Sequence, residues 1–155
     1  MRPEDEDGIW EIIREVIAGG DSYAFDPSST REEMLEFWRG PGKYTYVATR
    51  DKKILGSFVL RNNQPGLGSH IANGAYIVSS AASGQGIGKA MGLRSIEEAK
   101  RIGYRAMQFN FVVASNTRAV KLWLGLGFEI VGEVPEAFNH SQNGLTNIYI
   151  LYRKL

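Results

Sequence analysis

The segment Ser83–Gly88 carries three glycines at alternate positions, directly after an apolar, strand-like run through Tyr76–Val78. Beyond it, small and apolar residues recur at helical spacing to about Ile102. Glycine at alternate positions lets the backbone turn tightly and approach a ligand closely. The free amides and the positive dipole end of the following helix attract anions. A strand, a glycine turn and a helix start therefore predict a phosphate-binding site in a protein that mixes helices and strands.

Two familiar nucleotide loops do not match this segment. A P-loop has four residues between its first glycine and Gly-Lys-[Ser/Thr], whereas Gly84 and Gly88 enclose three residues and Lys89 is followed by Ala90. A dinucleotide fingerprint is G-x-G-x-x-G within an early βαβ unit. Here the spacing is G-x-G-x-G, and no such unit precedes it. The loop therefore favours another phosphate-bearing ligand.

The composition narrows the class of protein further. A chain of 155 residues predicts one domain, residues 1–155, at the usual ~150 residues per domain. Without cysteine and with only two histidines, His70 and His140, a metal site is not expected. The net charge of +1 argues against a nucleic-acid partner. With no long apolar stretch and an acidic start at Glu4–Asp7, we expect no membrane contact and a soluble, cytoplasmic protein.

The pattern along the chain predicts a mixed α/β layer fold. Apolar residues at helical spacing precede Gly19-Gly20, and Thr30 with Glu33 forms a capping box at the start of a second helix. Alternating segments joined at residues 51–53 predict a hairpin. The expected helices are 9–17, 30–38, 87–102 and 116–126, and the expected strands are 44–49, 54–60, one through 76–78, 106–113, 128–132 and 147–152.

A second motif follows the glycine loop along the chain. It reads Asn116-x-x-Ala119-x-x-Leu122-Trp123-x-x-x-Gly127-Phe128. Together, Gly84-Gln85-Gly86-Ile87-Gly88-Lys89-Ala90 and this block resemble the GNAT superfamily of N-acetyltransferases, over about Tyr44 to Leu155. The resemblance implies an α/β (α+β) fold with a mixed central sheet of six to seven strands, splayed central strands and about four flanking helices.

A closer resemblance is to the branch of that family with the fungal acetyltransferase of azetidine-2-carboxylate and related proline analogues. It rests on Asn62-Asn63-Gln64-Pro65-Gly66, His70-x-x-Asn73, Gln108-Phe109-Asn110 and Leu122-Trp123. In that branch the positions that match Asn73 and Asn110 line the acceptor pocket. The resemblance implies the same role here, with Tyr76 beside them.

Family resemblance also implies acetyl-CoA as the cosubstrate, held between the two splayed strands. Its amide-containing arm would pair with the edge of the first strand. The thioester oxygen would receive the backbone N–H near Val78, an oxyanion donor. The residues expected to bind the cosubstrate are Ile77, Val78, Ser83, Gly84, Gln85, Gly86, Ile87, Gly88, Lys89, Asn116 and Trp123.

Two positions depart from the family pattern. The first loop position is usually Arg or Gln, whereas this chain has Ser83. The tyrosine that often protonates the departing thiolate is replaced by Trp123, whose indole N–H donates a hydrogen bond but not a proton. The sequence therefore leaves the identity of a general acid open.

The group that removes a proton from the attacking amine is also open. A base is needed because an α-amine has a pKa near 8 and a lysine a pKa near 10.4, so both are largely protonated at neutral pH. His70 is the nearest titratable candidate for a base, although a histidine before a strand commonly has no such role. His140 lies in a polar segment, Asn139–Gly144, that indicates a hairpin loop. Asn73 and Asn110 stand among apolar neighbours in strands, where asparagine is disfavoured, so they need polar partners.

We therefore expect an enzyme that acetylates a small-molecule amine, such as an amino acid or proline analogue, by direct attack on the thioester. Two alternatives stay open: a non-catalytic acyl-CoA-binding module, favoured by Trp123 and the lack of an obvious base, and an enzyme that acetylates protein N-termini or lysines. The family resemblance also allows a homodimer. No feature of the sequence identifies the acceptor.

Overall fold

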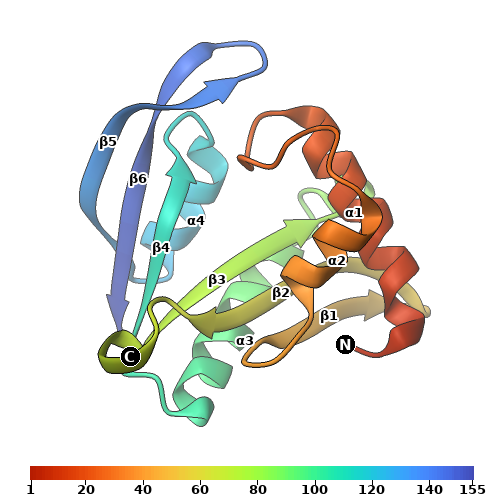
Figure 1. The fold of residues 1–155 in the computed structure, drawn as a ribbon, viewed down its shortest axis with the longest axis horizontal. Helices are drawn as coiled ribbons and strands as arrows, with labels where there is room; N and C mark the ends of the chain where they lie inside the picture. Colours follow the sequence, from red (N-terminus) through yellow and green to blue (C-terminus); the bar gives the residue numbers. More distant parts are fainter.

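Six strands form one mixed sheet in the computed structural model, which describes residues 1–155. The strand order is β1-β2-β3-β4-β6-β5, and only β3 and β4 run parallel (Figure 1). The expected mixed fold with four α-helices is confirmed. The elements are α1 (Glu6–Gly19), α2 (Arg31–Trp38), β1 (Tyr44–Arg50), β2 (Lys53–Asn62), β3 (Ile71–Val78), α3 (Ile87–Ile102), β4 (Ala106–Val113), α4 (Thr117–Gly125), β5 (Glu129–His140) and β6 (Gly144–Lys154).

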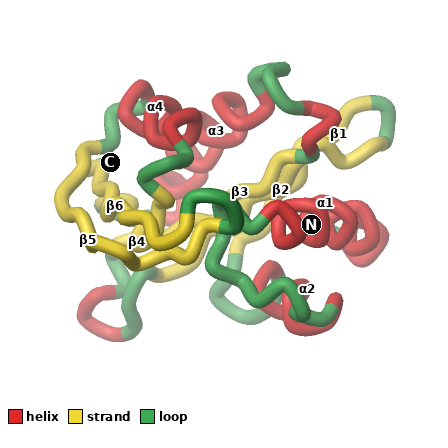
Figure 2. Tube along the Cα trace, turned by 90° about the horizontal axis from the view of Figure 1, so that it is seen from above, coloured by secondary structure: helices red, strands yellow, loops and turns green.

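Helices cover both faces of the sheet (Figure 2). Successive side chains of a strand point to opposite faces. In β2, Val59 packs into the apolar cluster of α1 and α2, whereas Phe58 and Leu60 pack into the cluster that includes α3 and the Trp123 ring of α4. The central strands therefore stand between two separate cores. None of the helices is both long and apolar enough to cross a membrane.

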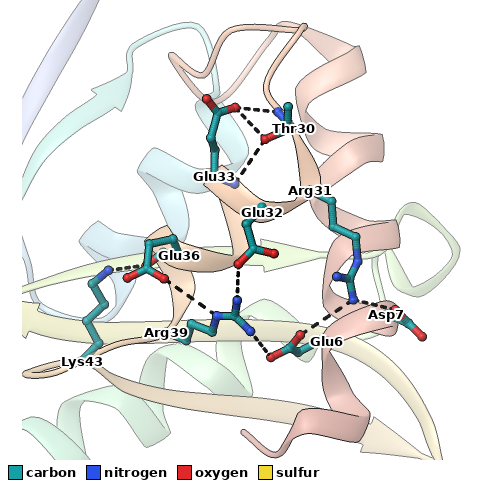
Figure 3. A network of polar contacts seen from close by, with 9 residues as sticks. All are labelled: Glu6, Asp7, Thr30, Arg31, Glu32, Glu33, Glu36, Arg39 and Lys43. Atoms are coloured by element: carbon teal, nitrogen blue, oxygen red, sulfur yellow. Dashed lines mark hydrogen bonds and ion pairs between the residues drawn. The ribbon is translucent and has the colours of Figure 1, made fainter.

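Polar contacts join α1 to α2 on one face of the sheet (Figure 3). The Thr30 hydroxyl accepts the Glu33 N–H, and the Glu33 carboxylate accepts the Thr30 N–H at 2.8 Å, which confirms the predicted capping box. At the other end of α2, the Arg39 guanidinium donates to the carboxylates of Glu6 on α1 and Glu32 on α2. These contacts fix the helix that carries Phe37, which lines the smaller of the two cavities described below.

Small residues let α3 lie close to its neighbours. Ser95 and Ala99 are fully buried. A Cβ atom at Gly92 would lie 2.5 Å from Cδ1 of Leu126 and 3.2 Å from Cζ3 of Trp123. The absence of a side chain at Gly92 therefore sets how closely α4 and the residues after it approach α3.

The C-terminal hairpin is longer than the sequence predicts. We expected strands over 128–132 and 147–152 with a loop at Asn139–Gly144, but β5 continues through His140 and the turn is confined to residues 141–143. Pro135 and two irregularities in register interrupt the alternation of β5, which hides the strand in the sequence. An edge strand tolerates both, because one side of its backbone has no partner.

We expect Gly92→Val to lower the free energy of unfolding by about 1–3 kcal/mol, because the added atoms have no space between α3 and Leu126. Gly125→Ala on α4 is the matched control, since a Cβ there meets nothing within 4 Å. Its stability should be unchanged or slightly higher. Urea denaturation of both variants measures the difference, and equal midpoints would contradict the packing role of Gly92.

Candidate active site

The parallel strands β3 and β4 pair only at one end. Ile71 lies opposite Ala106 and Ala72 opposite Met107, and the pairing stops there. The strands then diverge (Figure 1), and a cavity of about 950 Å³ opens between them. The expected splay of the central strands is therefore confirmed.

The splay leaves backbone groups of β3 without strand partners. Ser79, which follows β3, donates its N–H to the carbonyl of Leu55 in β2, so the odd-numbered residues of β3 direct their polar backbone groups toward β2. Because these groups alternate along a strand, those of Gly74, Tyr76 and Val78 face the cavity. The N–H of Val78, which the family resemblance implies as an oxyanion donor, thus faces this cavity. Ile77 also lines the cavity, although its backbone, by the same alternation, pairs with β2 and its side chain is buried in the apolar cluster of α1 and α2.

Tyr23, from the segment between α1 and α2, occupies part of this strand edge. Its hydroxyl donates to the Tyr76 carbonyl at 2.9 Å and accepts the Tyr76 N–H at 2.7 Å. Burial raises the pKa of Tyr23 to about 12, so the phenol stays neutral and can serve as both donor and acceptor. One side chain therefore satisfies both backbone groups of Tyr76.

The glycine loop opens directly into the large cavity. Gly84 and Gly86 adopt φ of +78° and +79°, and nothing lies within 4 Å of the place where either Cβ would stand. Gly86 is the N-cap of α3 and no side chain caps the helix. The first amides of α3 therefore have no partner in the protein and face a ligand site. Of the predicted loop residues, Ser83, Gly84, Gly86, Ile87, Gly88 and Lys89 line the cavity.

Gln85 differs from the expectation. Its side-chain oxygen accepts a hydrogen bond from Arg50 at 2.8 Å, and its amide donates to the Ala81 carbonyl at 2.9 Å. These two contacts engage the side chain, and Gln85 is not among the residues that line the cavity.

Three cations stand around the same end of the cavity. Lys89, Arg118 and Lys121 all belong to its wall. Arg118 donates to the Ser83 hydroxyl at 2.5 Å, so α4 places a guanidinium beside the loop position where the resembled family usually has Arg or Gln. Sequence reasoning missed this contact, since the two residues are far apart in the chain. The wall here combines free amides with positive charge, which suits a phosphate group.

Asn116 and Trp123 complete the wall on α4. The Asn116 side chain accepts the Ala119 N–H at 3.1 Å and so caps the helix, as the motif predicts. The Trp123 ring lies 4.6 Å from the rings of Tyr76 and Phe109, centroid to centroid. Trp123 is therefore part of the core and of the cavity wall together.

A smaller cavity of about 300 Å³ adjoins the large one on the side of α1 and α2. Asn73 and Asn110 both line it. Both donate to the same oxygen, Oδ1 of Asn63, at 3.2 and 2.7 Å. Asn73 also donates to the Gln108 carbonyl at 3.0 Å. Asn63 thus connects β3 and β4 just beyond the point where their pairing stops. Its place in a polar loop of the sequence did not indicate this role.

Comparison with known proteins identifies the family to which this chain belongs. The model of the acetyltransferase (GNAT) family matches residues 10–128 of the chain. The chain belongs to the GNAT acetyltransferase family. It is 31% identical over 142 residues to the N-acetyltransferase aca1 of Schizosaccharomyces pombe, covering 81% of this chain and 68% of that protein.

Solved structures agree with the family assignment. A GCN5-related N-acetyltransferase from Kribbella flavida is 41% identical, with a TM-score of 0.96 over 100% of this chain and 95% of that chain. A GNAT superfamily phosphinothricin acetyltransferase from Sinorhizobium meliloti, solved in complex with acetyl-CoA, shares the fold at 22% identity and a TM-score of 0.89. That match covers 100% of this chain and 85% of the other.

The side chain of Tyr76 does not reach the acceptor side of this acetyltransferase. Its hydroxyl donates to the Ser95 hydroxyl on α3 at 2.8 Å, and burial raises its pKa. Because residue 76 faces the α3 side of the sheet, its ring packs against the core, and the residue lines the large cavity but not the smaller one. The expected contact between this phenol and the acceptor has no support in the geometry.

Neither histidine is placed as a base. His70 is exposed, lies at the paired end of β3 before Ile71, and belongs to neither cavity wall. His140 lines the large cavity, but its Nδ1 accepts the N–H groups of Gln142 and Asn143 at 3.1 and 3.3 Å. Nδ1 is therefore occupied as an acceptor of two backbone N–H groups.

We expect Tyr23→Phe to change how stability depends on pH. A pKa raised to about 12 in the folded protein, against 10.0 ordinarily, means that ionisation favours the unfolded chain. The contribution of the neutral Tyr23 phenol to the free energy of unfolding is complete below pH 10 and is lost as the pH rises to about 12. The wild type should therefore lose more stability across this interval than Tyr23→Phe. The exposed Tyr44→Phe is the control, and a wild-type-like slope in Tyr23→Phe would contradict the burial of this phenol.

Proposed function

We propose that this acetyltransferase transfers the acetyl group of acetyl-CoA to the amine of a small molecule. The observation that carries the proposal is the uncapped start of α3, whose free amides and the cations Lys89, Arg118 and Lys121 surround one end of the splayed-strand cavity. Free backbone amides together with three cations are well suited to bind a pyrophosphate group. The acetyl-CoA complex of the Sinorhizobium meliloti relative supports the same cosubstrate here.

The residues present fit this ligand. At Gly84 and Gly86 the space that a Cβ would fill is empty, so phosphate oxygens can approach the backbone closely. The cavity then follows the unpaired edge of β3, where an amide-containing chain finds hydrogen-bonding groups at Val78 and Gly74. The same wall continues to Trp123, which offers an apolar surface beside the reacting end.

Direct attack accounts for the chemistry without a charged catalytic side chain. The neutral amine nitrogen attacks the thioester carbonyl carbon, the carbon–sulfur bond breaks, and the amine proton passes to water. The backbone N–H of Val78 stabilises the oxygen that gains charge. Trp123 donates no proton, so the sulfur leaves as the thiolate, which is an acceptable leaving group because the pKa of a thiol is only about 8.5. His70 has no part in this scheme, because it lies outside the cavity.

The small size of the adjoining cavity favours a small amine over a protein side chain. Its volume of about 300 Å³ suits a small molecule. Much of its wall is formed by Phe37, Phe109, Phe111 and the segment 22–25. If the protein instead bound acyl-CoA without catalysis, it would bind tightly and release no thiol with any amine.

A thermal-shift comparison of acetyl-CoA, CoA, ATP and NAD at equal concentration tests the cosubstrate. A ligand at 100 times its Kd adds about 2.7 kcal/mol of stability, which is enough to raise the Tm measurably. If the site binds CoA, only acetyl-CoA and CoA should produce this rise. Stabilisation by ATP or NAD alone would overturn the proposal. Thiol release with a panel of amines then separates an enzyme from a binding module.

Gly86→Asp should abolish the shift with acetyl-CoA, because a carboxylate would occupy the empty cradle and repel phosphate. We expect the Kd to rise at least about tenfold, equivalent to about 1.4 kcal/mol. Gly66→Asp is the matched control: Gly66 also has a positive φ, +56°, and nothing within 4 Å, but lies outside both cavities. Equal binding by both variants would place the phosphate site elsewhere.

A further inference from the structure

Arg61 holds a charge for which the protein supplies no partner. It lies on β2, directly opposite Asn73 of β3, on the face covered by α1 and α2. Its guanidinium stands 4.3 Å from the centre of the Phe37 ring and lines the smaller cavity. It makes neither an ion pair nor a hydrogen bond, although a guanidinium has five N–H donors.

The surroundings of Arg61 do not compensate its charge. Desolvation lowers the pKa of its guanidinium, and the nearby Lys43 is a second cation. The Tyr23 phenol, which lines the same cavity, is neutral. Arg39, which is half-buried like Arg61, is by contrast neutralised by Glu6 and Glu32 (Figure 3). A half-buried cation of this kind stabilises an anion that enters from outside.

The same cavity presents a group of opposite polarity. Both hydrogens of the Asn73 amide nitrogen are used, one on Oδ1 of Asn63 and one on the backbone carbonyl of Gln108. A backbone carbonyl only accepts, so it fixes the amide orientation. The Oδ1 atom of Asn73 is left without a protein partner, as an acceptor for an N–H group. Residues directly opposite on antiparallel strands have Cβ atoms about 5 Å apart, so one small molecule can contact Arg61 and Asn73 together.

This pair of groups lies next to the cavity that would hold the thioester. The two cavities share five wall residues, which are Ser22, Tyr23, Gly74, Phe109 and Phe111. Gly74 directly follows Asn73 and directs its backbone into the splay. An amine bound beside Asn73 is therefore at the junction of the two cavities, with Arg61 on the side away from the glycine loop.

We propose that Arg61 binds the carboxylate of the acceptor, and that the acceptor is therefore a small amino acid or amino-acid analogue with a free carboxylate, its amine directed to the Asn73 side-chain oxygen. This inference rests on the proposed function, because it names the acceptor of that same site. The guanidinium is the donor whose paired N–H groups match a carboxylate. The rings of Phe25, Phe37 and Phe109 in the wall suit an apolar side chain on the acceptor.

A purely structural Arg61 would give a different result, because its stacking on Phe37 does not depend on the acceptor. The test therefore changes the acceptor and the residue together. Free amino acids, including L-proline and azetidine-2-carboxylate, are each compared with their C-terminal amides in a thiol-release assay. Arg61→Gln, Arg61→Lys and Asn73→Ala are compared with wild type. Arg14→Gln is the matched control, since Arg14 is exposed on α1 and lies outside both cavities.

We expect wild type to prefer the acids, and Arg61→Gln to lower kcat/KM for them by about 10-fold to 100-fold, through KM, while leaving the amides unchanged. Arg61→Lys should restore part of the loss, because it keeps the charge but not the paired donors. Asn73→Ala should weaken acids and amides alike, since both carry the amine. Equal use of acids and amides by wild type, or an equal loss for both in Arg61→Gln, would overturn the inference.

Binding of a product analogue separates this inference from the proposed function. N-acetyl-L-proline and N-acetyl-L-prolinamide are compared by thermal shift, which needs neither turnover nor acetyl-CoA. An Arg61-dependent preference for the acid supports the carboxylate site even where acetyl-CoA fails to stabilise the protein, a result that would overturn the proposed function alone. Stabilisation by acetyl-CoA without any preference for the acid overturns the carboxylate site alone.

Discussion

The early end of the pairing between β3 and β4 is the constraint on which the rest of the structure depends. Two parallel strands that part after Ala72 and Met107 leave polar backbone groups without partners inside the protein. Unpaired backbone groups are costly unless something else meets them. Here the Tyr23 hydroxyl meets those of Tyr76, the Asn73 side-chain amide meets the Gln108 carbonyl, and the groups of Gly74 and Val78 face a cavity. The opening that admits a ligand is thus held by substitutes for the missing sheet bonds.

Charge is distributed along this opening in a way that matches a two-substrate enzyme. The end at the start of α3 has free amides and cations from two helices, which suits the phosphates of a large cosubstrate. The smaller cavity has a single guanidinium, Arg61, over an aromatic ring. Between these two ends lie the unpaired edge of β3 and the rings of Tyr76, Phe109 and Trp123. With the proposed function, a GNAT acetyltransferase of this design would rely on positioning more than on charged catalytic side chains.

The features that could be predicted from the sequence are those that depend on neighbouring residues in the chain. The capping box at Thr30, the glycine turn before α3 and the N-cap Asn116 each depend on residues within one turn, and all three are present. Contacts between distant segments were not predictable in this way. Arg118 beside Ser83, Tyr23 on the edge of β3 and Arg61 opposite Asn73 arise only once the chain is folded. The extent of β5 was also hidden, because Pro135 and irregular register break the alternation that marks a strand.

The double contact of Tyr23 connects the two cavities physically. The segment that carries this phenol lines both cavities, and its hydroxyl holds the two backbone groups of Tyr76, which lie between the free groups of Gly74 and Val78. A ligand that pairs with Tyr76 must compete with the phenol and release it from the strand. If a ligand displaces the phenol in this way, it also changes the wall of the smaller cavity, and by reciprocity a ligand in the smaller cavity then changes the affinity of the first ligand by the same factor. The hydroxyl that satisfies the backbone of Tyr76 is thus also the group through which binding in one cavity would affect binding in the other.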